Sequence, residues 1–190
     1  MKQMKHLLVV AAALCAAPAL AQTYEVEPSH SHLSWSTSHW GLSTYRGKFT
    51  RAAGKLSIDR AAKSASVELT IDAASQISGD DRLDKHLAAE DFFNVAKFPT
   101  IAFRSKRVEF SGDAPSRVEG ELTLLGITRP VTLQIGSFRC LEDRIQKTKE
   151  RCGGDASATI RRSDWGMKFA IPAIGDEVKL DLQLEVLRDK

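Results

Sequence analysis

The sequence lacks an excess of charge of either sign. Its 190 residues carry 27 Lys and Arg against 24 Asp and Glu, which gives a formal net charge of +3. Nucleic-acid-binding domains usually present a strongly basic face, so this balance argues against nucleic acid as a partner. Two catalytic motifs are also missing. The absence of G-x-S-x-G argues against an α/β-hydrolase, and the absence of C-x-x-C argues against a redox pair.

Long apolar runs are scarce as well, and the one at the start of the chain is too short to span a bilayer. It covers residues 7–17, follows two lysines and precedes an A-x-A sequence that ends at Ala21. This pattern predicts a secretory signal peptide over residues 1–21, cleaved after Ala21. We expect residues 22–190 to form one soluble periplasmic domain without a transmembrane segment. Its formal net charge is +1, because the signal peptide carries two lysines and no acids.

Cysteine is rare, with three residues in all. Cys15 leaves with the predicted signal peptide, and Cys140 and Cys152 remain on either side of a very polar segment. An even number of cysteines in an oxidising compartment favours a structural disulfide. We therefore predict that a Cys140–Cys152 disulfide clamps a long hairpin loop.

The dominant pattern in the rest of the chain is a period of two. Apolar and polar residues alternate in eight segments, and each segment is typical of a half-buried strand in an antiparallel sheet. The longest runs from Val178 to Val186, and turn sequences such as Ser78-Gly79-Asp80 separate the strands. The others centre on Leu33/Trp35, Leu56/Ile58, Val67–Ile71, Ile101/Phe103, Leu122/Leu124, Val131–Ile135 and Ala156–Ile160.

One segment breaks this alternation. Leu83, His86 and Leu87 have helical spacing after two acidic residues, which predicts a short α-helix over residues 81–90. About eight short strands with one helix favour a mainly β fold, a sandwich or a barrel. A closed barrel of eight strands is either filled by its side chains or wide enough for one small ligand. The alternation alone leaves both possibilities open.

Four segments resemble the YceI-like family of secreted, lipocalin-like barrels. They are "YEVEPSHSHLSWSTSHWGLSTYRGKF" at 24–49, "DKHLAAEDFFNVAKFPTIAF" at 84–103, "VEGELTLLGITRPVTLQ" at 118–134 and "IRRSDWGMKFAIPAIGDEVKLDLQLE" at 160–185. The resemblance implies an extended antiparallel β-barrel that holds a polyisoprenoid or a related amphiphile. It implies no catalytic residues and no cofactor other than the bound lipid. Glu27 departs from the Asp that the family usually has.

Aromatic residues cluster at strand ends, turns and the predicted helix, where they would suit an apolar slot with a few polar groups. We predict a binding site for a long apolar molecule, with His39, Trp40 and Leu42 at its mouth and Arg162 near the polar head group. The predicted ligand-binding residues are Leu33, Trp35, His39, Trp40, Leu42, Phe49, Phe92, Phe93, Phe103, Leu122, Leu124, Ala158, Arg162, Trp165 and Leu182.

The spacing of the histidines suggests a metal site as an alternative to the lipid-binding site. His30 and His32 lie two residues apart and share one face of a strand, which is a possible two-ligand arm. His39 has the opposite parity, so a third ligand is missing and we expect no metal. We expect His30 to form hydrogen bonds at the start of the strand.

Arg162 has two interpretations. It could contact a ligand, or it could be a buried cation, which must be paired. The second interpretation predicts a contact between Arg162 and Asp84.

Three functions follow. The first is a periplasmic carrier of a polyisoprenoid, quinone-type or fatty-acyl lipid, without enzymatic activity and possibly a homodimer. The second is a lipid-modifying or metal-dependent enzyme that uses His39 or His86. The third is a stress-related scaffold that binds a protein partner through the 140–152 loop.

Overall fold

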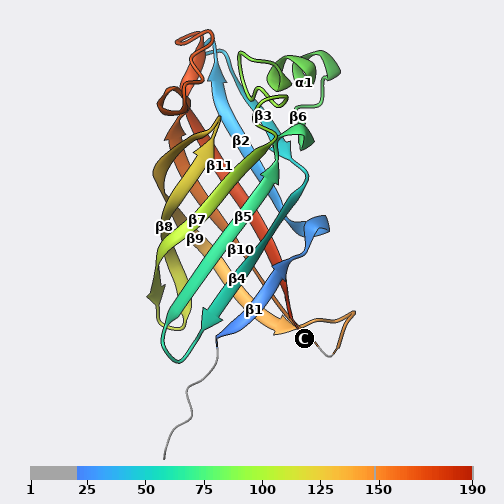
Figure 1. Ribbon diagram of the computed structural model, residues 1–190, viewed down its shortest axis with the longest axis vertical. Coiled ribbons are helices and arrows are strands. Elements are labelled where there is room, and N and C mark those ends of the chain that lie inside the picture. Colours follow the sequence, from blue (N-terminus) through green and yellow to red (C-terminus); the bar gives the residue numbers. More distant parts are fainter. Residues whose placement is uncertain (1–20, 148, 190) are drawn as a thin grey trace, which may run out of the picture.

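Antiparallel pairing of strands closes the chain into an elongated barrel (Figure 1). The computed structural model describes residues 21–147 and 149–189. The predicted signal peptide, except for Ala21, lies outside the described residues. Within the described ranges, no helix combines the length and the apolar character needed to cross a membrane.

The elements are bounded as follows. They are β1 (Gln22–Val26), η1 (Pro28–His30), β2 (His32–His39), β3 (Ser43–Phe49), β4 (Ala52–Asp59), β5 (Ser64–Asp72), η2 (Ala73–Ser75), β6 (Gln76–Ile77), α1 (Asp81–Ala88), β7 (Thr100–Ser111), β8 (Ala114–Leu124), β9 (Ile127–Glu142), β10 (Glu150–Arg161), η3 (Arg162–Trp165) and β11 (Ile174–Arg188).

The ring closes at β1, which pairs with β4 on one side and with β11 on the other. The ring order is β1, β4, β5, β7, β8, β9, β10 and β11, so eight antiparallel strands form the barrel. The prediction of a mainly β, eight-stranded antiparallel barrel is confirmed. All eight alternating segments lie in strands. The strands that the alternation missed are β1, β3 and β6, which are short or interrupted by Gly47.

The two ends of the barrel differ. β11 pairs with β1 near its end but with β2 over Val178–Gln183, and β3 and β6 continue the sheet beyond β2. Among the described strands, β6 pairs only with β3, while β7 pairs with β5 and β8. The sheet therefore splays between β6 and β7, and α1 lies at this end (Figure 1). We call this end the upper end and the opposite one the lower end.

Helix α1 begins as the sequence predicts and ends earlier. The carboxylate of Asp80 accepts hydrogen bonds from the backbone N–H groups of Arg82 and Leu83, which is an N-cap. The helix stops at Ala88 rather than at residue 90, because Ala89 is extended and its N–H group bonds to His86 O. This ending turns the following segment inward, so that Phe92 is buried.

Candidate ligand cavity

The upper half of the barrel contains an apolar cavity of about 240 Å³. Strand β2 contributes Leu33, Trp35, Thr37 and His39, which point to one face because side chains alternate along a strand. The six steps along the strand from Leu33 to His39 span about 20 Å, or about 15 Å along the barrel axis at a strand tilt of about 35–45°. An extended alkyl chain advances about 1.25 Å per carbon. The cavity is therefore deep enough for about 12 carbons.

The volume of the upper cavity points to a single apolar guest. It exceeds the roughly 150 Å³ of an engineered apolar cavity that stays dry and binds benzene. It falls slightly below the roughly 300–1,000 Å³ of sites for drug-sized ligands. One unbranched or sparsely branched chain fits these limits better than a bulky ring system.

Nine of the residues predicted to bind the ligand line the upper cavity, and the structure brings them together from distant parts of the chain. They are Leu33, Trp35, His39, Phe49, Phe92, Phe93, Leu122, Leu124 and Arg162. The sequence reasoning missed eleven others, most of which continue an apolar row or the helical spacing that it had already found. These are Thr37, Tyr45, Leu83, His86, Leu87, Ile101, Ile160, Met167, Ile174, Val178 and Leu180.

Three of the residues predicted to bind the ligand lie at the upper end of the barrel but do not line the cavity. Trp40 and Leu42 are 67% and 88% exposed on the turn between β2 and β3, and neither is among the residues that line the upper cavity. Trp165 lies behind the wall, where it is buried and its Nε1 donates to the carbonyl of Leu122 at 3.1 Å. Its role is to hold η3 against β8.

The remaining three lie at or below the floor of the upper cavity. Leu182 lines a second, smaller cavity of about 70 Å³ in the lower half of the barrel. Phe103 and Ala158 line neither cavity. The lumen is thus divided, which the alternation of the strands did not predict.

Aromatic side chains narrow the mouth of the upper cavity. The ring of His86 on α1 packs edge to face against Phe92 and Phe169, with centroid distances of 5.0 and 5.2 Å. Phe92 and Phe169 contact each other at 5.4 Å. Edge-to-face contacts of this kind add modestly to the burial energy. Helix α1 and the loop after η3 therefore meet over the opening.

The polar groups of the cavity wall lie on its upper part. His39 stacks on Tyr45, with ring centroids 4.0 Å apart and an interplanar angle of 9°. Thr37 Oγ1 donates to backbone carbonyls of the β11 segment. Within the described residues, no hydrogen bond joins His39 to a carboxylate or a hydroxyl group. His86 Nε2 lies 3.2 Å from an oxygen of Asp91, and both side chains are partly exposed.

Arg162 is buried at the same end, where it is 3% exposed. Its guanidinium donates to four backbone carbonyls, those of Met167 at 3.0 Å and of Phe169, Ile174 and Gly175 at 2.9 Å. Burial lowers the pKa of Arg162, and the charge of Asp176 opposes this effect. The side chain thus holds the loop between η3 and β11 in place beside the cavity.

The predicted contact between Arg162 and Asp84 is wrong. Asp84 accepts hydrogen bonds from the backbone N–H and the hydroxyl of Ser78, which fixes the start of α1. The carboxylate near Arg162 is Asp176, which binds Ser163 through the backbone N–H at 2.9 Å and the hydroxyl at 2.8 Å. Partial burial opposes ionisation of Asp176, but these bonds and the guanidinium outweigh it and lower its pKa.

The lower end contains a partly buried polar layer around Tyr24. Tyr24 is fully buried, and its hydroxyl donates to Glu150 at 2.7 Å while Arg60 pairs with the same carboxylate at 2.8 Å. The Cys140–Cys152 disulfide lies in the β9–β10 hairpin beside this layer, as predicted, with Cys152 fully buried. These contacts join β1, the end of β4 and the β9–β10 hairpin at the lower end.

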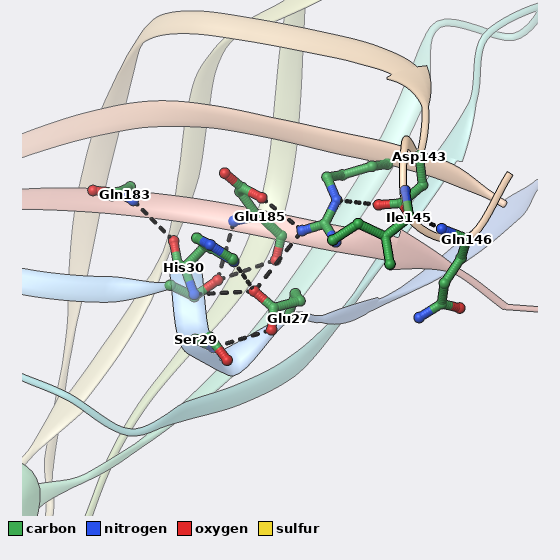
Figure 2. A network of polar contacts seen from close by, with 10 residues as sticks. Glu27, Ser29, His30, Asp143, Ile145, Gln146, Gln183 and Glu185 are labelled. Atoms are coloured by element: carbon green, nitrogen blue, oxygen red, sulfur yellow. Dashed lines mark hydrogen bonds and ion pairs between the residues drawn. The ribbon is translucent and has the colours of Figure 1, made fainter.

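A second ion-pair network ties the β9–β10 loop to the break between β1 and β2 (Figure 2). Arg151 bonds to Asp143 at 2.5 Å and to Glu185 at 2.7 Å. Asp143 is 2% exposed and also accepts from the backbone N–H groups of Ile145 and Gln146. The bond from Gln146, followed by that from Arg151, lowers the pKa of Asp143.

His30 belongs to this network rather than to a pair with His32. Its Nδ1 lies 2.5 Å from Glu27, as expected for a histidine that forms hydrogen bonds at a strand start. Glu27, His30 and Glu185 have ligand-type atoms close together. The guanidinium of Arg151 lies 2.7 Å from Glu185 and 3.8 Å from Glu27, so a cation already neutralises the two carboxylates.

Comparison with known proteins places this architecture in a family. The model of the YceI-like domain matches residues 24–186. A UPF0312 protein of Pseudomonas fluorescens is 34% identical over 193 residues, covering 100% of this chain and 98% of that protein. A UPF0312 protein of Pseudomonas aeruginosa is 33% identical over 190 residues, covering 98% of both chains.

Three solved structures share the fold at lower identity. BcnA of Burkholderia cenocepacia has a TM-score of 0.70 at 22% identity, covering 84% of this chain and 98% of that one. The YCEI protein of Campylobacter jejuni has a TM-score of 0.67 at 24% identity, covering 80% and 90%. A polyisoprenoid binding domain from Saccharophagus degradans has a TM-score of 0.65 at 17% identity, covering 90% and 100%.

Proposed function

Because this chain belongs to the YceI-like domain family, we propose that it is a periplasmic carrier of one long apolar amphiphile. The chain of the ligand occupies the upper cavity, and its head group lies at the mouth near His39 and Tyr45. The observation that carries the proposal is the cavity itself. Its wall is apolar apart from Thr37, the aromatic side chains that carry a polar atom, and Arg162, whose guanidinium bonds to four backbone carbonyls. The name of the Saccharophagus degradans neighbour supports a polyisoprenoid-type ligand.

Burial of the chain supplies enough free energy for reversible binding. About 12 methylene groups at about 0.8 kcal/mol each give about 10 kcal/mol. Association costs at least about 4 kcal/mol, so up to about 6 kcal/mol remains. This corresponds to a Kd of tens of micromolar from the chain alone. Contacts of the head group at the mouth then select the ligand and tighten its binding.

The compartment is part of the proposal. The sequence predicts cleavage after Ala21 and export, and the Cys140–Cys152 disulfide suits an oxidising compartment. Binding rather than catalysis is favoured by the surroundings of His39, whose ring stacks on Tyr45 instead of pairing with an acid.

Solvent extraction of the purified protein, followed by mass spectrometry, tests the proposal. The protein is prepared from its own host as wild type, as Leu180→Phe, which fills the upper cavity, and as Leu141→Phe, a matched change at a half-exposed site on β9. We expect an apolar amphiphile near one equivalent in the wild type and in Leu141→Phe, and much less in Leu180→Phe. Absence of such a molecule from the wild type, or equal amounts in all three, would contradict the proposal.

A further inference from the structure

The barrel lumen is divided at one level. On β11, Leu180 lines the upper cavity and the next inward residue, Leu182, lines the lower one. On β8, Leu122 lines the upper cavity and Val118 the lower one, with Gly120 between them. The boundary is therefore a layer one residue deep rather than a long packed plug.

Phe103 on β7 is the large side chain of this boundary. Its partner across β8 is Leu122, which lines the upper cavity, and its partner across β5 is Leu69, which lines the lower one. Phe103 is 6% exposed and lines neither cavity. It thus lies between the two cavities.

Gly120 provides the space that this ring occupies. A Cβ atom at Gly120 would lie 2.5 Å from Cζ and 2.8 Å from Cε2 of Phe103, which is closer than real contacts allow. The ring therefore lies against the bare backbone of β8. On β10, the residue at this level is Ala158, which pairs with Leu180 and is too small to form a barrier.

We propose that Phe103, seated on Gly120, is the floor of the ligand cavity and sets the longest chain that the protein accommodates. This inference rests on the proposed function and adds a specificity-determining residue to it. A chain that ends above the ring fills the upper cavity without disturbing the wall. A longer chain reaches the lower cavity only if the ring leaves its seat, which forfeits the dispersion contacts of a buried aromatic side chain.

A chain-length series tests the floor. Saturated fatty acids from C8 to C20, kept below their aggregation concentrations, compete with an apolar fluorescent dye for the wild type, Phe103→Ala, Phe103→Leu and Leu180→Ala. Each buried methylene improves affinity about fourfold, the equivalent of about 0.8 kcal/mol. We expect the wild-type affinity to rise in this way to about C12, the depth of the upper cavity, and then to level off.

The variants separate the floor from the wall. In Phe103→Ala the rise should continue to chains of about 18–20 carbons, because the lower cavity adds the span from Leu182 to Val186. Phe103→Leu, which keeps more of the buried volume, should move the break to an intermediate length even if Phe103→Ala fails to fold. Leu180→Ala should weaken binding at every chain length, because it removes wall contacts with the ligand. It should leave the break near C12, because the ring of Phe103 is unchanged.

Two results overturn the proposal. A wild-type affinity that rises without a break beyond C12 shows that the ring yields to the ligand. A break that stays at the same length in folded Phe103→Leu, verified by circular dichroism, shows that another residue limits the chain. Failure of the wild type to bind any acid of the series contradicts the carrier function itself, which separates that failure from failure of the floor.

Discussion

The two halves of this barrel are built from the same strands and close in different ways. At the lower end, a fully buried Tyr24, its partner Glu150 and a disulfide join the strands, and about 70 Å³ of cavity remains above them. At the upper end, aromatic rings and a loop held by Arg162 cover a cavity of about 240 Å³. Under the proposed function, this difference assigns ligand binding to the upper half.

The largest expected effect comes from the cation that organises the upper end. Arg162→Met should destabilise the protein by about 3–5 kcal/mol, because it leaves buried carbonyls without donors. It should also weaken ligand binding, since the loop beside the cavity loses its anchor. Chemical denaturation and ligand titration measure the two effects. The exposed neighbour Arg161→Met is the matched control, and equal losses in both variants would contradict this role.

The disulfide tests the other half. Cys140→Ser with Cys152→Ser should lower stability by about 3 kcal/mol and the Tm by roughly 6–12 °C, because the cross-link restricts the unfolded chain. Affinity for a C10 fatty acid should stay within about twofold of the wild type at temperatures where the variant is folded. Loss of binding under those conditions would show that the two halves are not separate in function.

Two equivalent substitutions test whether the upper and lower cavities are separate binding spaces. Leu180→Phe fills the upper cavity, and Leu182→Phe, the next inward position on β11, fills the lower one. We expect the first to weaken binding of a C10 fatty acid about tenfold or more, and the second to leave it nearly unchanged. Isothermal titration of both variants checks this. Comparable weakening by the two would mean that the acid reaches the lower cavity.

Asp143, at the lower end, contributes to the pH dependence of stability. The pKa of Asp143 is lowered by its hydrogen bonds from Gln146 and Arg151, so its stabilising contribution is complete above the usual carboxyl pKa near 4 and is lost as the pH falls through its folded value. The Tm of the wild type, measured by thermal unfolding, should therefore decrease below about pH 4. Asp143→Asn should be less stable at pH 7 and show a flatter acid dependence.

Part of the acid dependence should remain in Asp143→Asn, because the pKa values of Glu27, Asp72 and Asp176 are also lowered in the folded protein. Parallel curves for the wild type and the variant, offset by a constant amount, would contradict the assignment to Asp143.

The smallest effect is expected at the tip of the β2–β3 turn. Trp40 has a φ of +57°, a conformation that a bulky side chain rarely adopts and Asn tolerates, and it is 67% exposed. Trp40→Asn should leave stability unchanged or raise it by up to about 1 kcal/mol. Because Trp40 does not line the cavity, C10 binding should not change. A tenfold weaker affinity would place Trp40 in the binding site after all.

The sequence predicted the barrel well because alternation reports directly on which face of a strand is buried. Val178 to Val186 is one such row, and it lies in β11 as expected. The alternation failed where an inward position carries no side chain. In β3, Gly47 interrupts the row between Tyr45 and Phe49, because the ring of Trp35 covers its backbone.

The site was less predictable, and the reasons are physical. The partners of Arg162 are backbone carbonyls, which every residue has, so no residue type could identify them. The division of the lumen depends on the register that sets Phe103 beside Gly120, two residues on different strands. Trp40 and Leu42 show the converse. Their apolar character suggested a place at the mouth of the site, and in the structure both side chains are exposed to solvent.

The crystal structure of the protein purified from its own host tests the central claim most directly. We predict one continuous, elongated feature of electron density that enters at the mouth beside His39 and Tyr45, follows the wall formed by Leu33 and Leu180, and ends above the ring of Phe103. A lumen in which the side chains of the upper half meet across the axis, with no room for a guest molecule, would contradict it.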